Sequence, residues 1–134
     1  MSAPYSQKLQ AKTIAVATAS DTEVSMGEAP FAGTLTDATY TPDATITGVD
    51  TNSRTISIVN KGQTGVGTTS MASLALTNGV NAPGYDEKAI TLSGTPANLV
   101  VAKGDILSFK SLHIGTGLAD PGGLVQVELT ASYA

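Results

Sequence analysis

Three residues in the last quarter of the sequence are of the types that hydrolases use. His113 is the only histidine, Ser111 precedes it by two positions, and Asp120 follows it. On one strand, residues i and i+2 share a face without bringing a base against a nucleophile, and the Gly-x-Ser-x-Gly turn is absent. We therefore predict that His113 is a strand residue held by a hydrogen bond, that the chain has no catalytic residues, and that it is not an enzyme.

The sequence also contains few residues of the types that bind metal ions. With one histidine and no cysteine, disulfides and thiolate sites are excluded, and any ligand set would consist mainly of carboxylates. Asp50, Asn52 and Ser53 could begin a calcium loop, but the glycine and the late glutamate that complete such a loop are missing. We interpret this segment as an ordinary turn and predict neither a metal site nor a cofactor.

Two further kinds of motif are weak. Asp86 and Glu87 are adjacent, and neighbours on a strand face opposite sides, which argues against a glycosidase that uses paired carboxylates. Gly65-Val66-Gly67 and Gly115-Thr116-Gly117 are too short to cradle a phosphate, and no Lys-Ser/Thr pair or helix start follows them. We expect both glycine-containing segments to be loops.

The aromatic residues are four tyrosines and two phenylalanines. Phe109 lies between Leu107 and Leu112 and is predicted to belong to the core rather than to an exposed carbohydrate-binding platform. Three tyrosines are candidates for interface anchors, with a place in the core or at its rim as the alternative: Tyr40, Tyr85 and Tyr133.

Composition narrows the class of partner. Only 13% of the 134 residues are charged, the net charge is -4, and threonine, with 19 residues, is the commonest type. Threonine favours strands, and an acidic chain lacks the basic surface that nucleic acid requires. No apolar run approaches the length of about 20 residues that spans a bilayer, and Met1–Gln10 does not resemble a signal peptide. We therefore expect a partner that is neither nucleic acid nor membrane, because a surface with few charges suits lasting contact with protein.

The elements that must position these residues read as short strands. Apolar residues alternate with threonine, serine and other polar residues between turns rich in Gly, Pro, Asn and Asp. The segment with Met71, Leu74 and Ala75 also fits one turn of helix. We expect about eight strands, within residues 12–20, 23–26, 33–40, 54–60, 71–76, 85–92, 104–114 and 124–130. Residues 99–101 lead into the last two strands, which are expected to pair across a sharp turn.

These strands predict one all-β domain, an antiparallel β-sandwich with a jelly-roll-like connection. A chain of this length can bury a core without disulfides. Residues 1–10, which include Pro4 and show no sustained period, are predicted to form an extended N-terminal arm. Residues 11–134 are predicted to form the sandwich.

Four stretches resemble the head decoration, or cement, proteins of tailed bacteriophages. They are Thr47–Thr55 (TGVDTNSRT), Val59–Gly62 (VNKG), Lys103–Leu107 (KGDIL) and Gly115–Gly123 (GTGLADPGG). The resemblance implies a β domain on the outer surface of the virion capsid, made in the host cytoplasm, bound to the major capsid protein and often a homotrimer. It carries no catalytic residue across to this sequence.

A protein of this kind would stabilise the shell by bridging neighbouring capsid subunits, because such contacts add binding energy to the intact lattice only. We expect the arm, Met1–Gln10, to contact the shell, and an apolar or threonine-rich sheet face to join the protomers. An alternative is a phage tail or fibre module that binds a receptor or glycan. A carbohydrate-active β-sandwich enzyme is disfavoured by the solitary histidine and the unpaired carboxylates.

Overall fold

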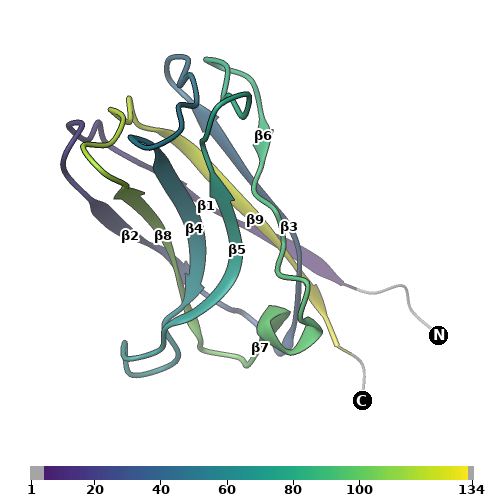
Figure 1. The fold of residues 1–134 in the computed structure, drawn as a ribbon. Helices are drawn as coiled ribbons and strands as arrows, with labels where there is room; N and C mark the ends of the chain where they lie inside the picture. The colour runs from purple at the N-terminus through teal and green to yellow at the C-terminus, as the bar shows by residue number, and fades with distance from the viewer. Residues whose placement is uncertain (1–4, 133–134) are drawn as a thin grey trace.

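The chain folds into two antiparallel β-sheets packed face to face, in a computed structural model that describes residues 5–132 (Figure 1). The strands are β1 (Ser6–Lys12), β2 (Thr22–Glu28), β3 (Gly33–Pro42), β4 (Arg54–Asn60), β5 (Thr69–Ala75), β6 (Lys88–Ala89), β7 (Val100–Val101), β8 (Ile106–His113) and β9 (Gly123–Ala131), and η1 (Pro96–Leu99) is a short 3-10 helix. One sheet has the order β1-β9-β3-β6, with β7 also paired to β3, and the other has the order β2-β8-β4-β5. The predicted all-β antiparallel sandwich is confirmed.

The predicted pairing of the last two strands is wrong. β8 pairs with β2 and β4, whereas β9 pairs with β1 and β3, so the two strands lie in different sheets. The segment between them, residues 114–122, is long enough to cross the end of the sandwich, and each strand buries its own apolar face. The chain also crosses between sheets after β1, β2, β3, β5 and β7. This crossing is consistent with a jelly-roll-like connection, which stays a prediction.

The core lies between the sheets and follows the two-residue period of the strands. Val125, Val127 and Leu129 of β9 point inward and are buried, as the alternation in the sequence predicts. Across the core, Phe109 of β8 packs against the ring of Tyr40, with ring centroids 5.1 Å apart. The helical alternative for the segment after residue 69 is wrong, because β5 pairs along β4.

The amino-terminal part of the chain differs from the prediction. The expected strand over residues 12–20 is absent, since the chain leaves the sheet after Lys12, Ile14 is exposed, and Val16 makes only an isolated bridge to Asp120. The expected arm is wrong for residues 6–10, which belong to β1 and pair with β9, while Leu9 packs against the core. Residues 1–4 of that arm lie outside the described residues.

β1 escaped the prediction because it is an edge strand with little apolar content. Only Leu9 and Ala11 of β1 turn toward the core, and its other residues are exposed. Residues 5–132 include no helix with the length and hydrophobicity that a membrane span requires.

Candidate functional site

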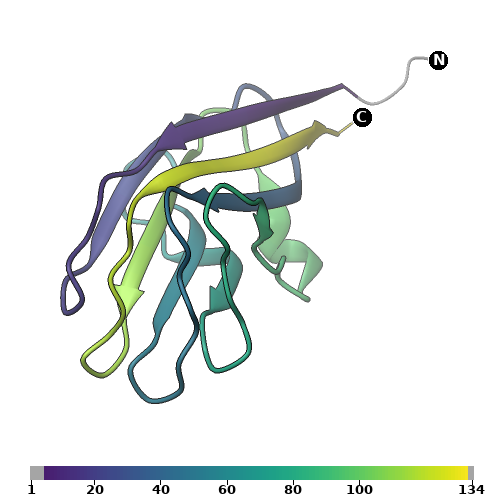
Figure 2. The same ribbon diagram turned by 90° about the horizontal axis from the view of Figure 1, so that it is seen from above.

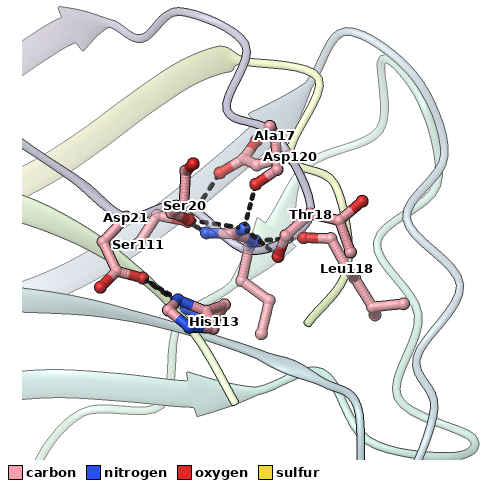
Figure 3. Close-up of polar contacts among 9 residues, drawn as sticks. Ala17, Thr18, Ser20, Asp21, Ser111, His113, Leu118 and Asp120 are labelled. Carbon is pink, nitrogen blue, oxygen red and sulfur yellow. Dashed lines mark hydrogen bonds and ion pairs between the residues drawn. The ribbon is translucent and has the colours of Figure 1, made fainter. Parts of the chain in front are cut away.

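Ser111 and Asp120 do meet, but without the histidine. The Ser111 hydroxyl donates to Asp120 Oδ2 at 2.8 Å, and both side chains are buried at the end of the sandwich (Figure 3). His113 turns elsewhere, with Nδ1 2.6 Å from Asp21 Oδ1. The prediction that His113 is a strand residue held by a hydrogen bond is therefore confirmed, and these three residues do not form a catalytic triad.

The centre of this end of the molecule is Arg54, the first residue of β4. Its side chain is fully buried, and its guanidinium donates to the Ser111 hydroxyl and to carbonyl oxygens of two loops. One loop lies between β1 and β2, and the other lies between β8 and β9. The acceptors are Ser111 Oγ at 3.1 Å and the carbonyls of Leu118, Ala17, Thr18 and Ser20 at 2.6, 3.1, 3.3 and 2.9 Å.

Asp120 supplies the negative charge of the same network. Its carboxylate accepts hydrogen bonds from the Tyr40 hydroxyl at 2.6 Å and the Gly122 amide at 3.0 Å, besides the one from Ser111. Ser111 thus relays between the guanidinium of Arg54 and the carboxylate, which compensates two buried charges. Burial, and then the bond to Asp120, raises the pKa of Tyr40 far above its ordinary value.

This network is a structural tie, and it corrects one candidate anchor. Tyr40 belongs to β3 of the five-stranded sheet, whereas Arg54 and Ser111 belong to the four-stranded sheet, so the network joins both sheets and two loops. Because Tyr40 is fully buried, it is not an interface anchor and takes the alternative place in the core. Tyr133, another candidate, lies outside the described residues.

Sequence reasoning missed Arg54, although a signal was present. Arg54, Ile56 and Ile58 occupy alternate positions of one strand and therefore share its face. Both isoleucines are fully buried, so the period places the arginine on the core face as well. A charged residue in phase with buried isoleucines predicts a buried cation that needs several acceptors.

The contact between His113 and Asp21 lies at the surface. The two side chains are 32% and 45% exposed. The backbone N–H of His113 donates to the carboxylate at 2.8 Å, and this bond, together with that from the ring, lowers the pKa of Asp21 below its ordinary value. The pair fastens the loop before β2 to the end of β8.

The segment with Asp50, Asn52 and Ser53 is a turn, as predicted, but the side chains of Asp50 and Asn52 bond to other loops rather than within the turn. Asp50 Oδ1 accepts the Asn78 amide at 3.0 Å, and Asn52 Oδ1 accepts the Thr116 amide at 3.0 Å. These side chains fasten neighbouring loops to one another. Within residues 5–132, no group of three or more His, Cys, Asp or Glu side chains is placed to hold a metal ion.

Asp86 and Glu87 lie in a loop before β6 rather than on a strand, and both are exposed. The argument from opposite strand faces therefore does not apply to them. Gly65-Val66-Gly67 and Gly115-Thr116-Gly117 are in loops, as expected.

A second carboxylate, Asp105, organises the opposite end of the molecule. It accepts hydrogen bonds from the Ala102 amide at 2.9 Å, from Asn60 Nδ2 at 3.0 Å and from Gln63 Nε2 at 3.5 Å. Burial alone would raise the pKa of Asp105, but these hydrogen bonds outweigh burial and lower it. The carboxylate therefore holds the loop before β8 against the loop after β4.

The two loops that Arg54 ties together and two neighbouring loops form a surface that we call the loop end: residues 13–21, 43–53, 76–87 and 114–122. Figure 2 shows these four loops side by side, all projecting from the same end of the sheets. Four large apolar side chains are exposed on them: Tyr85 (80%), Ile14 (73%), Ile114 (47%) and Val49 (43%). Tyr85 sits at a positive φ of 59°, and its amide donates to the Pro42 carbonyl at 2.7 Å.

The described part of the chain contains no pocket. A small ligand is usually bound in a concave site, whereas exposed apolar side chains on an open surface suit contact with a macromolecule. The loop end is therefore a candidate protein-binding surface.

The stretches that carry the resemblance to decoration proteins meet in space as two pairs. Residues 47–55 contact residues 115–123 through the bond from the Thr116 amide to Asn52, and residues 59–62 contact residues 103–107 through the Lys61 amide and the Ile106 carbonyl, 2.8 Å apart. They hold β4 beside β8 at both ends. No family model, curated protein or solved structure matches this chain.

Proposed function

We propose that the chain is a structural virion protein that binds the outside of a bacteriophage capsid and stabilises the shell by bridging major capsid protein subunits. The resemblance of four stretches to decoration proteins supports this, as does a surface built for contact rather than reaction. The jelly-roll-like connection, the homotrimer and the place on the outer capsid surface belong to the same proposal. Partners are the major capsid protein and further copies of this chain.

The observation that carries the proposal is the set of exposed apolar residues on stiff loops. Ile14, Val49, Tyr85 and Ile114 stand on loops of the loop end. Arg54 and the loop-to-loop hydrogen bonds of Asp50 and Asn52 fix the backbone there. A surface already ordered before binding loses little conformational entropy on contact, so it binds more tightly than a mobile surface of the same size.

Bridging explains how such a contact would stabilise a shell. The protein adds its binding energy only while neighbouring capsid subunits stay together, so separation of the subunits becomes less favourable. An oligomer that presents several loop ends binds its later contacts at high effective concentration, and modest individual contacts then give a lasting bond.

The test compares two exposed residues at opposite ends of the molecule. Tyr85→Ala removes the most exposed aromatic ring of the loop end, and Val66→Ala, at a residue 79% exposed in the loop between β4 and β5, is the matched control. Loss of an aromatic anchor costs about 2 kcal/mol, or roughly thirtyfold in affinity. We expect that loss for Tyr85→Ala and less than about a twofold change for Val66→Ala, measured by sedimentation with undecorated phage heads.

Saturation at a fixed ratio to shell subunits is expected for the unaltered protein. Failure to bind heads would refute the proposal, and equal effects of the two substitutions would remove the loop end from it. The second candidate, a tail or fibre module that binds a receptor or glycan, is favoured by the exposed ring of Tyr85. Labelled protein found on tails rather than on heads would support that candidate.

A further inference from the structure

Two strand edges lie open on the same side of the sandwich. In the part of the chain that the structure describes, β1 pairs only with β9, and β2 pairs only with β8. The edges are neighbours, because Leu9 Cδ2 lies 3.9 Å from the position that a Cβ on Gly27 would take. The other side is closed, since the Ile90 amide bonds to Ala38 of one sheet and the Ser93 amide to Met71 of the other.

The ladder of β1 identifies the groups that its open edge presents. The Ala131 amide donates to Tyr5 and the Thr13 amide donates to Gly123, so the odd-numbered residues of β1 bond to β9. The even-numbered residues therefore direct their N–H and C=O groups away from the sheet. They are Ser6, Lys8, Gln10 and Lys12, all exposed.

On β2 the same reasoning identifies acidic positions. The Ala29 amide bonds to the Asp105 carbonyl, so the alternating pattern turns the backbone groups of Glu28 toward the open edge. Glu28 and Glu23 are both exposed. One edge therefore carries lysines and the other carries glutamates.

The spacing of these charges matches. Lys8 and Lys12 are four residues apart, and Glu23 and Glu28 are five apart with a bulge in the ladder between Ser25 and Gly27. A bulge adds one residue to one strand, so the glutamates also stand four ladder positions apart. An antiparallel β1 alongside β2 places Lys8 opposite Glu28 and Lys12 opposite Glu23.

We propose that a second copy of this chain docks by pairing its β1 edge, antiparallel, with the β2 edge of the first. Leu9 and Gly27 stand at the same height within one copy, so any rotation axis parallel to these strands brings Lys8 of one copy level with Glu28 of the next. Each copy then uses both edges, and the assembly closes. The inference specifies the self-association that the proposed function includes and rests on that part of it.

The chemistry of the edges distinguishes this pairing from simple edge protection. Lysine on an exposed edge usually prevents strand addition, because a like-charged or apolar partner cannot accommodate it. Here an acidic edge of matching spacing is available on every copy, and opposite charges across a strand pair favour association. The other two charged residues also form ion pairs within the chain: Lys12 with Asp43 at 2.5 Å, and Glu23 with Lys61 at 3.7 Å.

Lys8 and Glu28 make the sharper test, because neither forms an ion pair within residues 5–132. Lys8→Glu and Glu28→Lys each place like charges opposite one another and are expected to weaken self-association at least about tenfold. The double variant Lys8→Glu/Glu28→Lys restores the opposite charges and should return within about threefold of the unaltered chain. Lys88→Glu, an equal change of charge on β6 at the opposite edge of the five-stranded sheet from β1, is the control and should have no effect.

Sedimentation equilibrium and light scattering on the pure protein measure the association, and a dimer or a trimer supports the proposal equally. Amide exchange at Lys8 and Gln10 should slow as protein concentration rises, while the amide of Leu9, which bonds to β9, should be protected at all concentrations. A monomer at about 1 mM, the weak limit of specific affinity, would refute the pairing and leave the lysines as edge protection. So would an oligomer unchanged by Lys8→Glu. These measurements use the pure protein without phage heads. A failure of self-association is therefore distinguished from a failure to bind the capsid.

Discussion

Arg54→Met tests whether the buried guanidinium holds the loop end together. Methionine fills much of the same space but leaves the Asp120 carboxylate buried without its cation and removes the donor from five acceptors. Removing one member of a buried charge pair costs about 3–5 kcal/mol. We use about 4 kcal/mol, because the loop carbonyls are only partly buried and can bind water once they are released.

Unfolding entropy converts that cost into a temperature. At about 2.1 cal/mol/K per residue, a chain of 134 residues has an unfolding entropy of about 0.28 kcal/mol/K, so the melting temperature should fall by about 14 °C. Urea denaturation followed by circular dichroism measures the free energy of unfolding directly. Lys61→Met, which removes an equal charge from a side chain 26% exposed, is the control and should cost less than about 1 kcal/mol.

A second substitution examines the relay through Ser111. Asp120→Asn should destabilise the Arg54→Met protein less than it destabilises the unaltered protein, because the carboxylate without a cation is then the more costly group. The reasoning fails if Arg54→Met costs less than about 1 kcal/mol, or if the two substitutions are additive.

Two further predictions concern the carboxylate at the opposite end and a close backbone approach. The folded pKa of Asp105 lies below the ordinary 3.8, so its carboxylate stabilises the fold above about pH 4, and that stability is lost as the pH falls through the folded pKa. Asp105→Asn should therefore lower the urea midpoint at pH 7, with a gap that narrows in acid; a gap independent of pH would contradict this. Gly48→Ala should destabilise the fold by more than about 2 kcal/mol, because its Cβ would clash with the Thr77 carbonyl oxygen. At Gly94 an added Cβ meets no atom within 4 Å, so Gly94→Ala should be neutral or stabilising by about 0.5 kcal/mol. Equal urea midpoints for the two alanine variants would refute the steric argument.

Much of the secondary structure could be predicted from local pattern. β4 occupies residues 54–60 as expected, and β3 and β9 extend the predicted segments by only a few residues, because turn residues bound an alternation that the sheet then uses. β1 could not be predicted, since an edge strand buries only Leu9 and Ala11 and its register is set by β9, far away in sequence. The prediction of which strand pairs with β8 was wrong for the same reason, because alternation identifies a strand and its two faces but not the strand beside it.

The candidate site divides in a similar way. The hydrogen-bonded strand residue His113 could be predicted from residue types and spacing. The loop end could not, because four loops from distant parts of the sequence form it only after both sheets have packed. Its central residue, Arg54, was readable in the phase of β4 but draws its acceptors from loops more than thirty positions away.

The strand order also governs how the chain can be made. β9 lies between β1 and β3, and β8 lies between β2 and β4, so one interior strand of each sheet is synthesised after all the other described strands of that sheet. While residues 106–131 are still inside the ribosome, β1 and β2 have no strand to pair with, and the core lacks the buried side chains of β8 and β9. Nascent chains of this protein must therefore remain soluble with both sheets incomplete, and premature termination in this region would release a product prone to aggregation.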